Sequence, residues 1–210
     1  GSRGVAITWI HASSQAALEM LARAHTHVAG AHLFDEVSGE FNVPFVRRMA
    51  APEPMQVVTL ACWELGLLVH PVRQTEVRGI EDVLRPGMRF VQREPGAEAR
   101  ALVERLLRRA GAPDDALAGA PVVHGHFAVA QTIATGGADA GVATRAAALA
   151  HALAFVPLAE ERFDLIIPRD LSAAPAVVQL VETLQGRAFR RELDCLGGYH
   201  TRRTGDAVPV

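Results

Sequence analysis

Short apolar runs alternate along this chain with segments whose apolar residues recur at helical spacing. The runs are rich in β-branched residues, which is typical of buried strands. They predict strands at residues 5–10, 27–33, 57–63, 67–70, 89–93, 138–142, 155–158 and 163–168. The segments between them predict helices from Ser13 or Ser14 to about His25 and at 43–49, 97–110, 127–135, 146–153, 175–184 and 187–195, with a helical turn at 80–84. This alternation predicts an α/β fold with mostly parallel sheets.

The remaining segments are expected to be loops. Residues 35–42 carry turn chemistry around Ser38-Gly39, and the tail at 201–210 is expected to fray. At 210 residues the chain fits one domain, or two small lobes that share a hinge.

The composition narrows the possible functions. Half of the residues are hydrophobic, as in a globular chain with a core, and a net charge of -2 gives no sign of a nucleic-acid surface in this segment. All 21 basic residues are arginine. The lack of lysine excludes a Walker-type phosphate loop and a Schiff-base mechanism, because both need an amine.

Cysteine usage and apolar run length bear on the compartment. Cys62 and Cys195 lie far apart in apolar segments and are expected to be buried free thiols. No apolar run reaches membrane-spanning length and no signal peptide is recognisable, so a cytoplasmic origin is expected. The chain opens with Gly1-Ser2 and no methionine, which suggests a domain cut from a longer protein.

The turn from the first expected strand into the first helix is one candidate ligand site. His11-Ala12-Ser13-Ser14 occupies it, and parallel α/β sheets place ligands at the carboxyl ends of their strands. The hydroxyls and unpaired helix N–H groups could hold an anion. The alternative, which is more common locally, is that a serine simply caps the helix.

A second candidate site is the turn from the strand at 89–93 into the helix at 97–110. Gly96 allows close backbone approach before Ala97, and Arg93 or Arg100 could bind an anion in bidentate fashion. Glu98 in the first helical turn suits the helix dipole.

His124-Gly125-His126 forms a third candidate, again at the start of a helix. A His-x-His pair suggests a metal ion, but no third ligand is evident, so no metal is expected here. His25 and His27 form a weaker pair of the same kind. His126 and Asp139 are expected to line or brace the ligand site. We find no nucleophile elbow, metalloprotease helix, dinucleotide fingerprint or catalytic carboxylate pair, so we expect no catalytic residues.

Three spaced stretches resemble the periplasmic-binding-protein-like domain found behind a helix-turn-helix in bacterial and archaeal regulators, and fused to molybdopterin-biosynthesis proteins. Their residues are 27–33 with 39–42, 87–93 with Gly96 and Arg100, and 126–130 with 137–141; the resemblance continues at 155–158, Glu160, 164–165 and 196–199.

The resemblance implies a type 2 binding-protein fold, related to molybdate- and tungstate-binding proteins. It implies two lobes, with residues 1–86 and 162–210 in one and 88–158 in the other. The chain would cross between them near 84–89 and 158–164. A small ligand would lie between helix N-termini of the two lobes.

The ligand loops depart from the family's pattern. The first loop usually reads Gly-Ser-His-Asp, where this chain has His11-Ala12-Ser13-Ser14. The second usually reads Gly-Ser/Ala-Gly-Thr-Arg, so a threonine hydroxyl is lost here and the carboxylate of Glu98 is gained. A carboxylate near an oxyanion such as molybdate, tungstate or sulfate costs energy unless Arg93 or Arg100 neutralises it, and a small organic acid is the other expected ligand.

Three functions follow from these features. The leading hypothesis is an effector-sensing domain of a transcriptional regulator, which would reach DNA through a domain outside this segment and could form a homodimer. The second is a transport binding protein for molybdate, tungstate or a similar anion. The third is an enzyme that has adopted this fold, and no residue set requires it.

Overall fold

The chain divides into two compact units. The computed structural model describes residues 6–49 and 53–210. Unit 1 consists of Gly1–Cys62 and Glu161–Val210, and unit 2 of Trp63–Glu160. The chain passes from unit 1 to unit 2 after Cys62 and returns to unit 1 after Glu160.

Two long strands, β4 (Met55–Val69) and β8 (Ala154–Pro168), each have residues in both units. The sequence predicted two short strands in each place, and this was wrong. In β4 the expected break was at Glu64-Leu65-Gly66, but Gly66 continues the strand. A Cβ at Gly66 would collide with the Val156 carbonyl oxygen and the Phe155 ring, so the glycine permits a close approach of β8.

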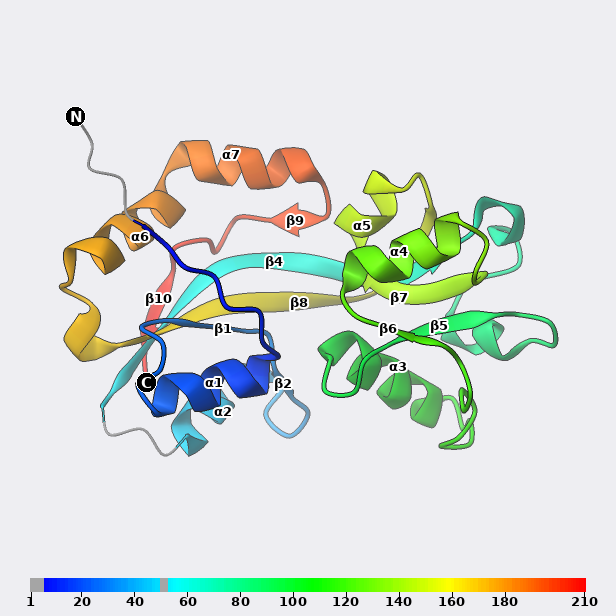
Figure 1. The fold of residues 1–210 in the computed structure, drawn as a ribbon, viewed down its shortest axis with the longest axis horizontal. Helices are drawn as coiled ribbons and strands as arrows, with labels where there is room; N and C mark the ends of the chain where they lie inside the picture. The colour runs from blue at the N-terminus through cyan, green and yellow to red at the C-terminus, as the bar shows by residue number, and fades with distance from the viewer. Residues whose placement is uncertain (1–5, 50–52) are drawn as a thin grey trace. The chain divides into compact units, whose positions relative to one another are not determined.

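Unit 1 places helices on both faces of its strands (Figure 1). Its strands besides β4 and β8 are β1 (Ala29–Ala31), the hairpin β2 (Phe34–Asp35) and β3 (Glu40–Phe41), β9 (Tyr199–His200) and β10 (Ala207–Pro209). Its helices are α1 (Ser14–Ala22), α2 (Val43–Arg48), α6 (Pro175–Gln185) and α7 (Arg187–Leu196), with a 3-10 turn at Arg169–Leu171.

Each face of unit 1 has its own core. Leu18, Leu21 and Val46 of α1 and α2 pack on one face against Ala29, Val57 and Ile166. Val177 and Leu184 of α6 pack on the other face against Val58, Leu165 and Ile167. Alternate residues of β4 and β8 therefore serve opposite cores, as strand pleating requires.

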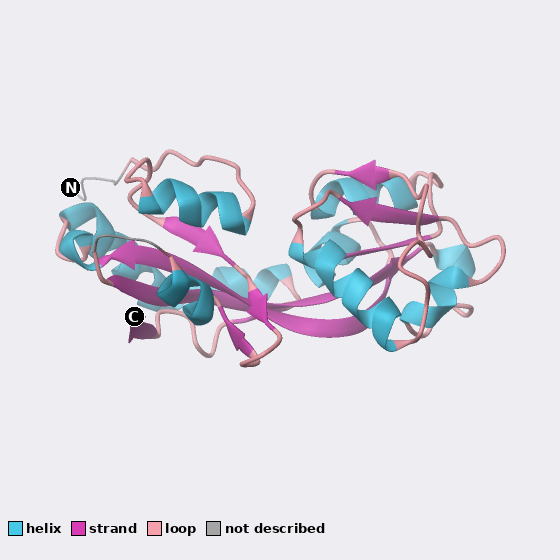
Figure 2. Ribbon diagram, turned by 90° about the horizontal axis from the view of Figure 1, so that it is seen from below, coloured by secondary structure: helices cyan, strands magenta, loops and turns pink. Residues whose placement is uncertain are grey.

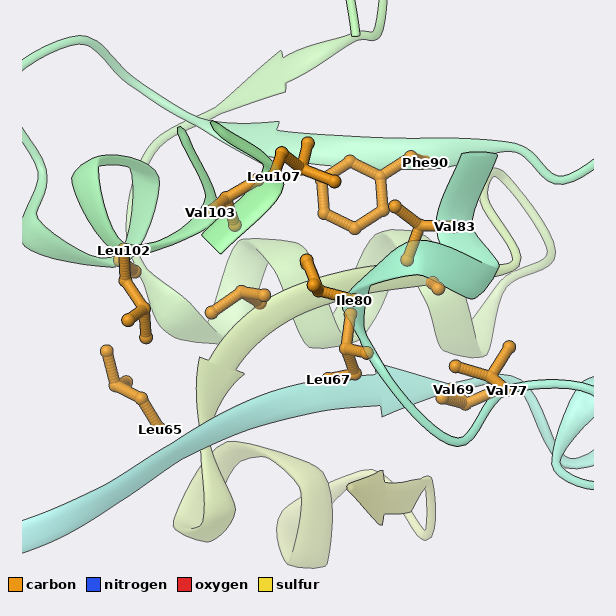
Figure 3. Close-up of a cluster of buried hydrophobic side chains, with 13 residues drawn as sticks. Leu65, Leu67, Val69, Val77, Ile80, Val83, Phe90, Leu102, Val103 and Leu107 are labelled. Carbon is orange, nitrogen blue, oxygen red and sulfur yellow. The ribbon is translucent and has the colours of Figure 1, made fainter. Parts of the chain in front are cut away.

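Unit 2 is also layered, with β5 (Phe90–Arg93), β6 (Val122–Val123) and β7 (Ala140–Thr144) beside β4. One face carries α3 (Glu98–Arg109) and the 3-10 turn Ile80–Leu84, and the other carries α4 (His126–Ala134) and α5 (Arg145–Ala150) (Figure 1 and Figure 2). A further 3-10 turn, Pro71–Arg73, follows β4. Val103 and Leu107 of α3 lie beside Phe90, and Leu102 faces Leu65 (Figure 3). The helical spacing of the apolar residues in 97–110 thus fixes how α3 packs.

The expected mostly parallel sheet is wrong. Hydrogen-bonded neighbours run β1-β8-β4-β7-β5-β6, with β9 and β10 also on β4. Only β5 with β6 and β5 with β7 are parallel among the described pairs, whereas β1–β8, β4–β7, β4–β10 and β2–β3 are antiparallel. The alternation of elements could not show this, because it does not fix which strands become neighbours.

Three local predictions were also wrong. Of the strand expected at 5–10, residue 5 lies outside the described residues, and residues 6–10 form no strand and are exposed, including Trp9 at 73%. A β-branched run becomes a strand only where a partner completes the ladder. The loop expected at 35–42 contains the β2–β3 hairpin, and the tail expected to fray contains β10, with Thr204 fully buried.

Among the described residues, no helix combines the length and apolar character that a membrane crossing requires. Cys62 is half-buried and Cys195 is exposed, so the expectation that both thiols are buried was wrong for Cys195.

Candidate functional site

The first expected ligand loop starts α1 in unit 1, and its hydroxyls already have partners. Ser13 is the N-cap of α1 and its Oγ accepts a hydrogen bond from the Ala16 N–H at 3.3 Å. Ser14 is buried and its Oγ accepts from the His32 N–H at 3.2 Å. His11 lies in the exposed, irregular segment before the helix.

A buried polar network lies near the residues that contact this loop, and sequence reasoning gave it no role. Asn42 is fully buried; its Oδ1 accepts from the Leu33 N–H at 2.8 Å and its Nδ2 donates to Asp164 Oδ2 at 2.8 Å. Arg162 Nε donates to the same Asp164 oxygen at 2.9 Å. Asn42 also has a φ of +58°, a backbone conformation that asparagine tolerates better than most residues.

Next to this network, His32 Nδ1 lies 3.2 Å from Oε2 of the buried Glu161. The His32 ring also stacks on Phe163, with 5.9 Å between ring centroids. The signal for these residues was present in the sequence, because polar side chains interrupt apolar strands, but their partners are far away along the chain.

The second and third expected loops meet in unit 2. Arg93 ends β5 and is paired in register with Val123 of the parallel neighbour β6, which leads into α4. Because neighbouring parallel strands end at the same edge, Arg93 lies beside the first residue of α4. Arg93 Nη1 is 3.1 Å from His126 Nδ1. A guanidinium only donates, so Nδ1 of His126 accepts and its proton belongs on Nε2.

Glu94, which the sequence analysis did not single out, binds Arg93 through both carboxylate oxygens. Arg93 Nε donates to Oε2 at 2.7 Å and Nη2 to Oε1 at 2.8 Å. The side chains are 11% and 19% exposed, respectively. The hydrogen bond from Arg93 is the main cause that lowers the pKa of Glu94 to about 2, and a backbone hydrogen bond at Gly125 adds to it. Glu94 therefore stays ionised at neutral pH, near the start of α4.

The residues between Arg93 and α3 have separate roles. Gly96 has a φ of +83°, so only glycine fits this turn without strain, and Ala97 is the N-cap of α3 with no side-chain cap. Glu98 lies 3.6 Å from Arg105, and both side chains are largely buried. The charge of Glu98 is thus balanced within its own helix.

Arg100 pairs with Glu104 at 2.8 Å and its Nη1 reaches the Arg93 carbonyl at 3.5 Å. It also lines a cavity of about 510 Å³ between α3 and the loop at 112–120, together with Gln92 and Leu107. Arg100 therefore contacts the backbone of the β5–α3 turn and lines this cavity.

Asp139 braces unit 2. Arg89 holds it with a fork, Nη2 to Oδ1 at 2.7 Å and Nε to Oδ2 at 3.1 Å, and the Arg89 N–H also donates to Oδ2. The Arg89 side chain is the main cause that lowers the pKa of Asp139. These bonds fasten the start of β5 to the start of β7.

Within residues 6–49 and 53–210, no group of three or more histidine, cysteine, aspartate and glutamate side chains is arranged to hold a metal ion. His126 of the His-x-His pair contacts the positively charged guanidinium of Arg93. This guanidinium disfavours a metal cation beside His126.

Two layered α/β units joined by two long shared strands, with charged groups at strand-to-helix turns, define a binding-protein-like ligand-binding domain. The model of the PBP superfamily domain matches residues 1–185, and the chain belongs to this family. The expected fold class is thereby confirmed.

Two curated relatives are similar in sequence. YvgK of Bacillus subtilis (strain 168) is 29% identical over 182 residues, which are 86% of this chain and 58% of YvgK. A protein encoded in the 5' region of a 2Fe-2S ferredoxin gene of Clostridium pasteurianum is 36% identical over 84 residues, which are 40% of this chain and 74% of that protein. The chain thus spans little more than half the length of YvgK.

Solved structures share the fold at low identity. A phosphate transporter substrate-binding protein of Clostridium perfringens with bound phosphate has a TM-score of 0.61 at 9% identity, over 88% of this chain and 83% of that one. The ancestral amino-acid-binding protein AncCDT-1 has 0.59 at 14% identity, over 92% and 78%. A histidine kinase sensor domain has 0.52 at 15% identity, over 83% and 72%.

Proposed function

We propose that this chain senses a small ligand through an anionic group that binds at Arg93. The observation that carries the proposal is the position of Arg93: it is a largely buried guanidinium at the carboxyl end of a strand, between the starts of α3 and α4. Ligands of open α/β sheets bind at such strand ends. Membership of the PBP superfamily supports a small-molecule ligand for this chain.

Arg93 has hydrogen-bonding capacity left for a ligand. Its guanidinium carries five N–H donors, and its contacts with Glu94 and His126 use three of them. Two remain unused by the described residues. A carboxylate is the group that two guanidinium donors bind best, so a small organic acid fits the proposal.

Sensing is preferred to transport because the stretches at 27–33, 87–93 and 126–130 resemble regulator domains, and because a sensor domain is among the proteins with this fold. The regulatory form of the proposal places DNA binding in a part of the protein outside this chain. Transport of an anion is the second candidate, since a phosphate-transporter protein also has this fold.

The test is a thermal-shift screen of oxyanions and small organic acids, followed by calorimetry of the hits on the wild type and on Arg93→Met. A ligand of the native state raises the melting temperature by mass action. We expect Arg93→Met to weaken the best ligand at least tenfold, as the loss of hydrogen bonds to a charged group predicts (about 1.5–3 kcal/mol). A ligand whose affinity is the same in both proteins would contradict the proposed site.

The three functions separate in a second step. Sensing requires that the ligand change the affinity of the complete protein for DNA, transport requires that it does not, and an enzyme would consume the bound compound during prolonged incubation. We expect the first result.

A further inference from the structure

We infer that Glu94 sets the charge of the ligand: it acts as a built-in anion that admits a singly charged ligand carrying a hydrogen-bond donor and discriminates against doubly charged oxyanions. The inference deepens the proposed function and rests on it, because it concerns what Arg93 can bind. Glu94 thus becomes a specificity-determining residue.

Geometry gives Glu94 this role. Both of its oxygens lie within 2.8 Å of Arg93 nitrogens, so the pair carries no net charge. A ligand oxygen that reaches the other two N–H groups of Arg93 must approach the same guanidinium that the carboxylate holds. Each additional negative charge on the ligand therefore meets repulsion from Glu94 in a partly water-excluded place.

Neighbouring charges do not cancel this repulsion. Glu98 is paired with Arg105 and Arg100 with Glu104, so each nearby arginine of α3 is balanced by a carboxylate. The start of α4 offers a partial positive charge, and the Glu94 carboxylate already bonds to the backbone there.

Glu94 also offers the ligand something. A carboxylate has about four lone-pair positions; on Glu94, Arg93 uses two, and backbone hydrogen bonds at Glu94 and Gly125 reach the same group. A hydroxyl or ammonium group on the ligand would still be attracted to the negative charge of Glu94 while the ligand's own carboxylate binds Arg93. A hydroxy acid or a zwitterion satisfies both partners, whereas sulfate, molybdate or tungstate satisfies only Arg93.

The experiment compares sulfate, a dianion, with glycolate, a monoanion that carries a hydroxyl donor. Both are titrated by two-dimensional NMR into the wild type, Glu94→Gln, Arg93→Met/Glu94→Gln and the control Glu76→Gln. Glu76 is an ion-paired glutamate of the same unit that bonds to Arg73, away from the proposed site. Melting curves and the NMR spectra check that each variant is folded.

We expect Glu94→Gln to bind sulfate at least tenfold more tightly than the wild type, and the double variant to lose this gain. Glycolate is expected to gain less than threefold in Glu94→Gln, and Glu76→Gln to match the wild type for both probes. A sulfate affinity in Glu94→Gln within threefold of the wild type overturns the inference, as does a gain that survives removal of Arg93.

The two proposals fail differently. If sulfate does not respond to Glu94→Gln while the ligand found by screening still depends on Arg93, the charge-setting role of Glu94 is wrong and the proposed function stands. If that ligand is also indifferent to Arg93→Met, both are wrong.

Discussion

The two units use the polar residues that precede their helices in opposite ways. In unit 1, Ser13 caps α1 and the buried Ser14 bonds to the backbone of His32. In unit 2, Arg93 and Glu94 hold each other where β5 ends, and Arg93 retains donors for a further partner.

The number of hydrogen-bonding positions explains the difference. A buried hydroxyl or amide must be satisfied by the protein itself, so it contributes to stability and has little left for a ligand. The Arg93 guanidinium is also largely buried, but it has five N–H donors and its contacts with Glu94 and His126 use three of them. The sequence motif alone, a strand followed by polar residues and a helix, is the same in both units and cannot separate the two uses.

The comparison predicts its largest effect at Asn42 of unit 1. Asn42→Ala leaves the Leu33 N–H and Asp164 without their partner in a buried place and puts alanine at positive φ. We expect a loss of about 3 kcal/mol in the free energy of unfolding, measured by urea denaturation.

Two further variants sharpen this result. Asn42→Gly removes the same hydrogen bonds without the backbone strain and should be about 1 kcal/mol less harmful than Asn42→Ala. Gln15→Ala, which removes an exposed amide bonded to Glu19, should change stability by less than about 0.5 kcal/mol. A loss below about 1 kcal/mol in Asn42→Ala would mean that the buried network is not what holds unit 1.

Much of the fold could be predicted from the local sequence pattern, and the predictions that were wrong share a cause. Periodicity located α1, α3, α4 and α6 within a few residues, because a helix satisfies its own backbone. Strand pairing is non-local, so residues 6–10 had the composition of a strand without a ladder partner, and β4 continued through Gly66 because β8 approaches it there. Whether neighbouring strands run parallel or antiparallel could not be predicted for the same reason.

The candidate site was predicted in part. Sequence spacing placed Arg93 and His126 at helix starts, and the parallel register of β5 and β6 brings them together. Glu94 was overlooked because neighbours in sequence on a strand usually point to opposite faces, and only the turn after β5 lets its side chain fold back onto Arg93. The sequence suggested that the carboxylate of Glu98 would oppose anion binding, but its charge is balanced by Arg105.

A second prediction tests whether the serines of unit 1 act on the fold or on the ligand. Ser14→Ala removes the acceptor of the His32 N–H, and Ser13→Ala removes the cap of α1. We expect each to lower the free energy of unfolding by about 1–2 kcal/mol. We expect neither to change ligand affinity more than twofold in calorimetry. A tenfold loss of affinity with unchanged stability would place the ligand at this loop and remove the contrast between the units.

The smallest expected effect concerns the Arg93–Glu94 pair in acid. The pKa of Glu94 is about 2 in the folded protein, below its ordinary value of 4.5, because Arg93 donates to its ionised form. A lowered pKa means that the pair's contribution is complete above the ordinary value and is lost as the pH falls toward 2. Solvent screening of a partly exposed pair limits that contribution to about 1 kcal/mol.

Asp139 and Asp35 also have lowered pKa values, so the total stability of the wild type falls in acid for several reasons at once. The contribution of Glu94 is therefore measured as the difference in unfolding free energy between the wild type and Glu94→Gln, followed by urea denaturation from pH 7 to pH 2.5. We expect this difference to be constant above about pH 5 and to shrink by about 1 kcal/mol below it. If the difference stayed the same throughout, Glu94 would not be held by Arg93 in solution, and the guanidinium would be available to a doubly charged anion after all.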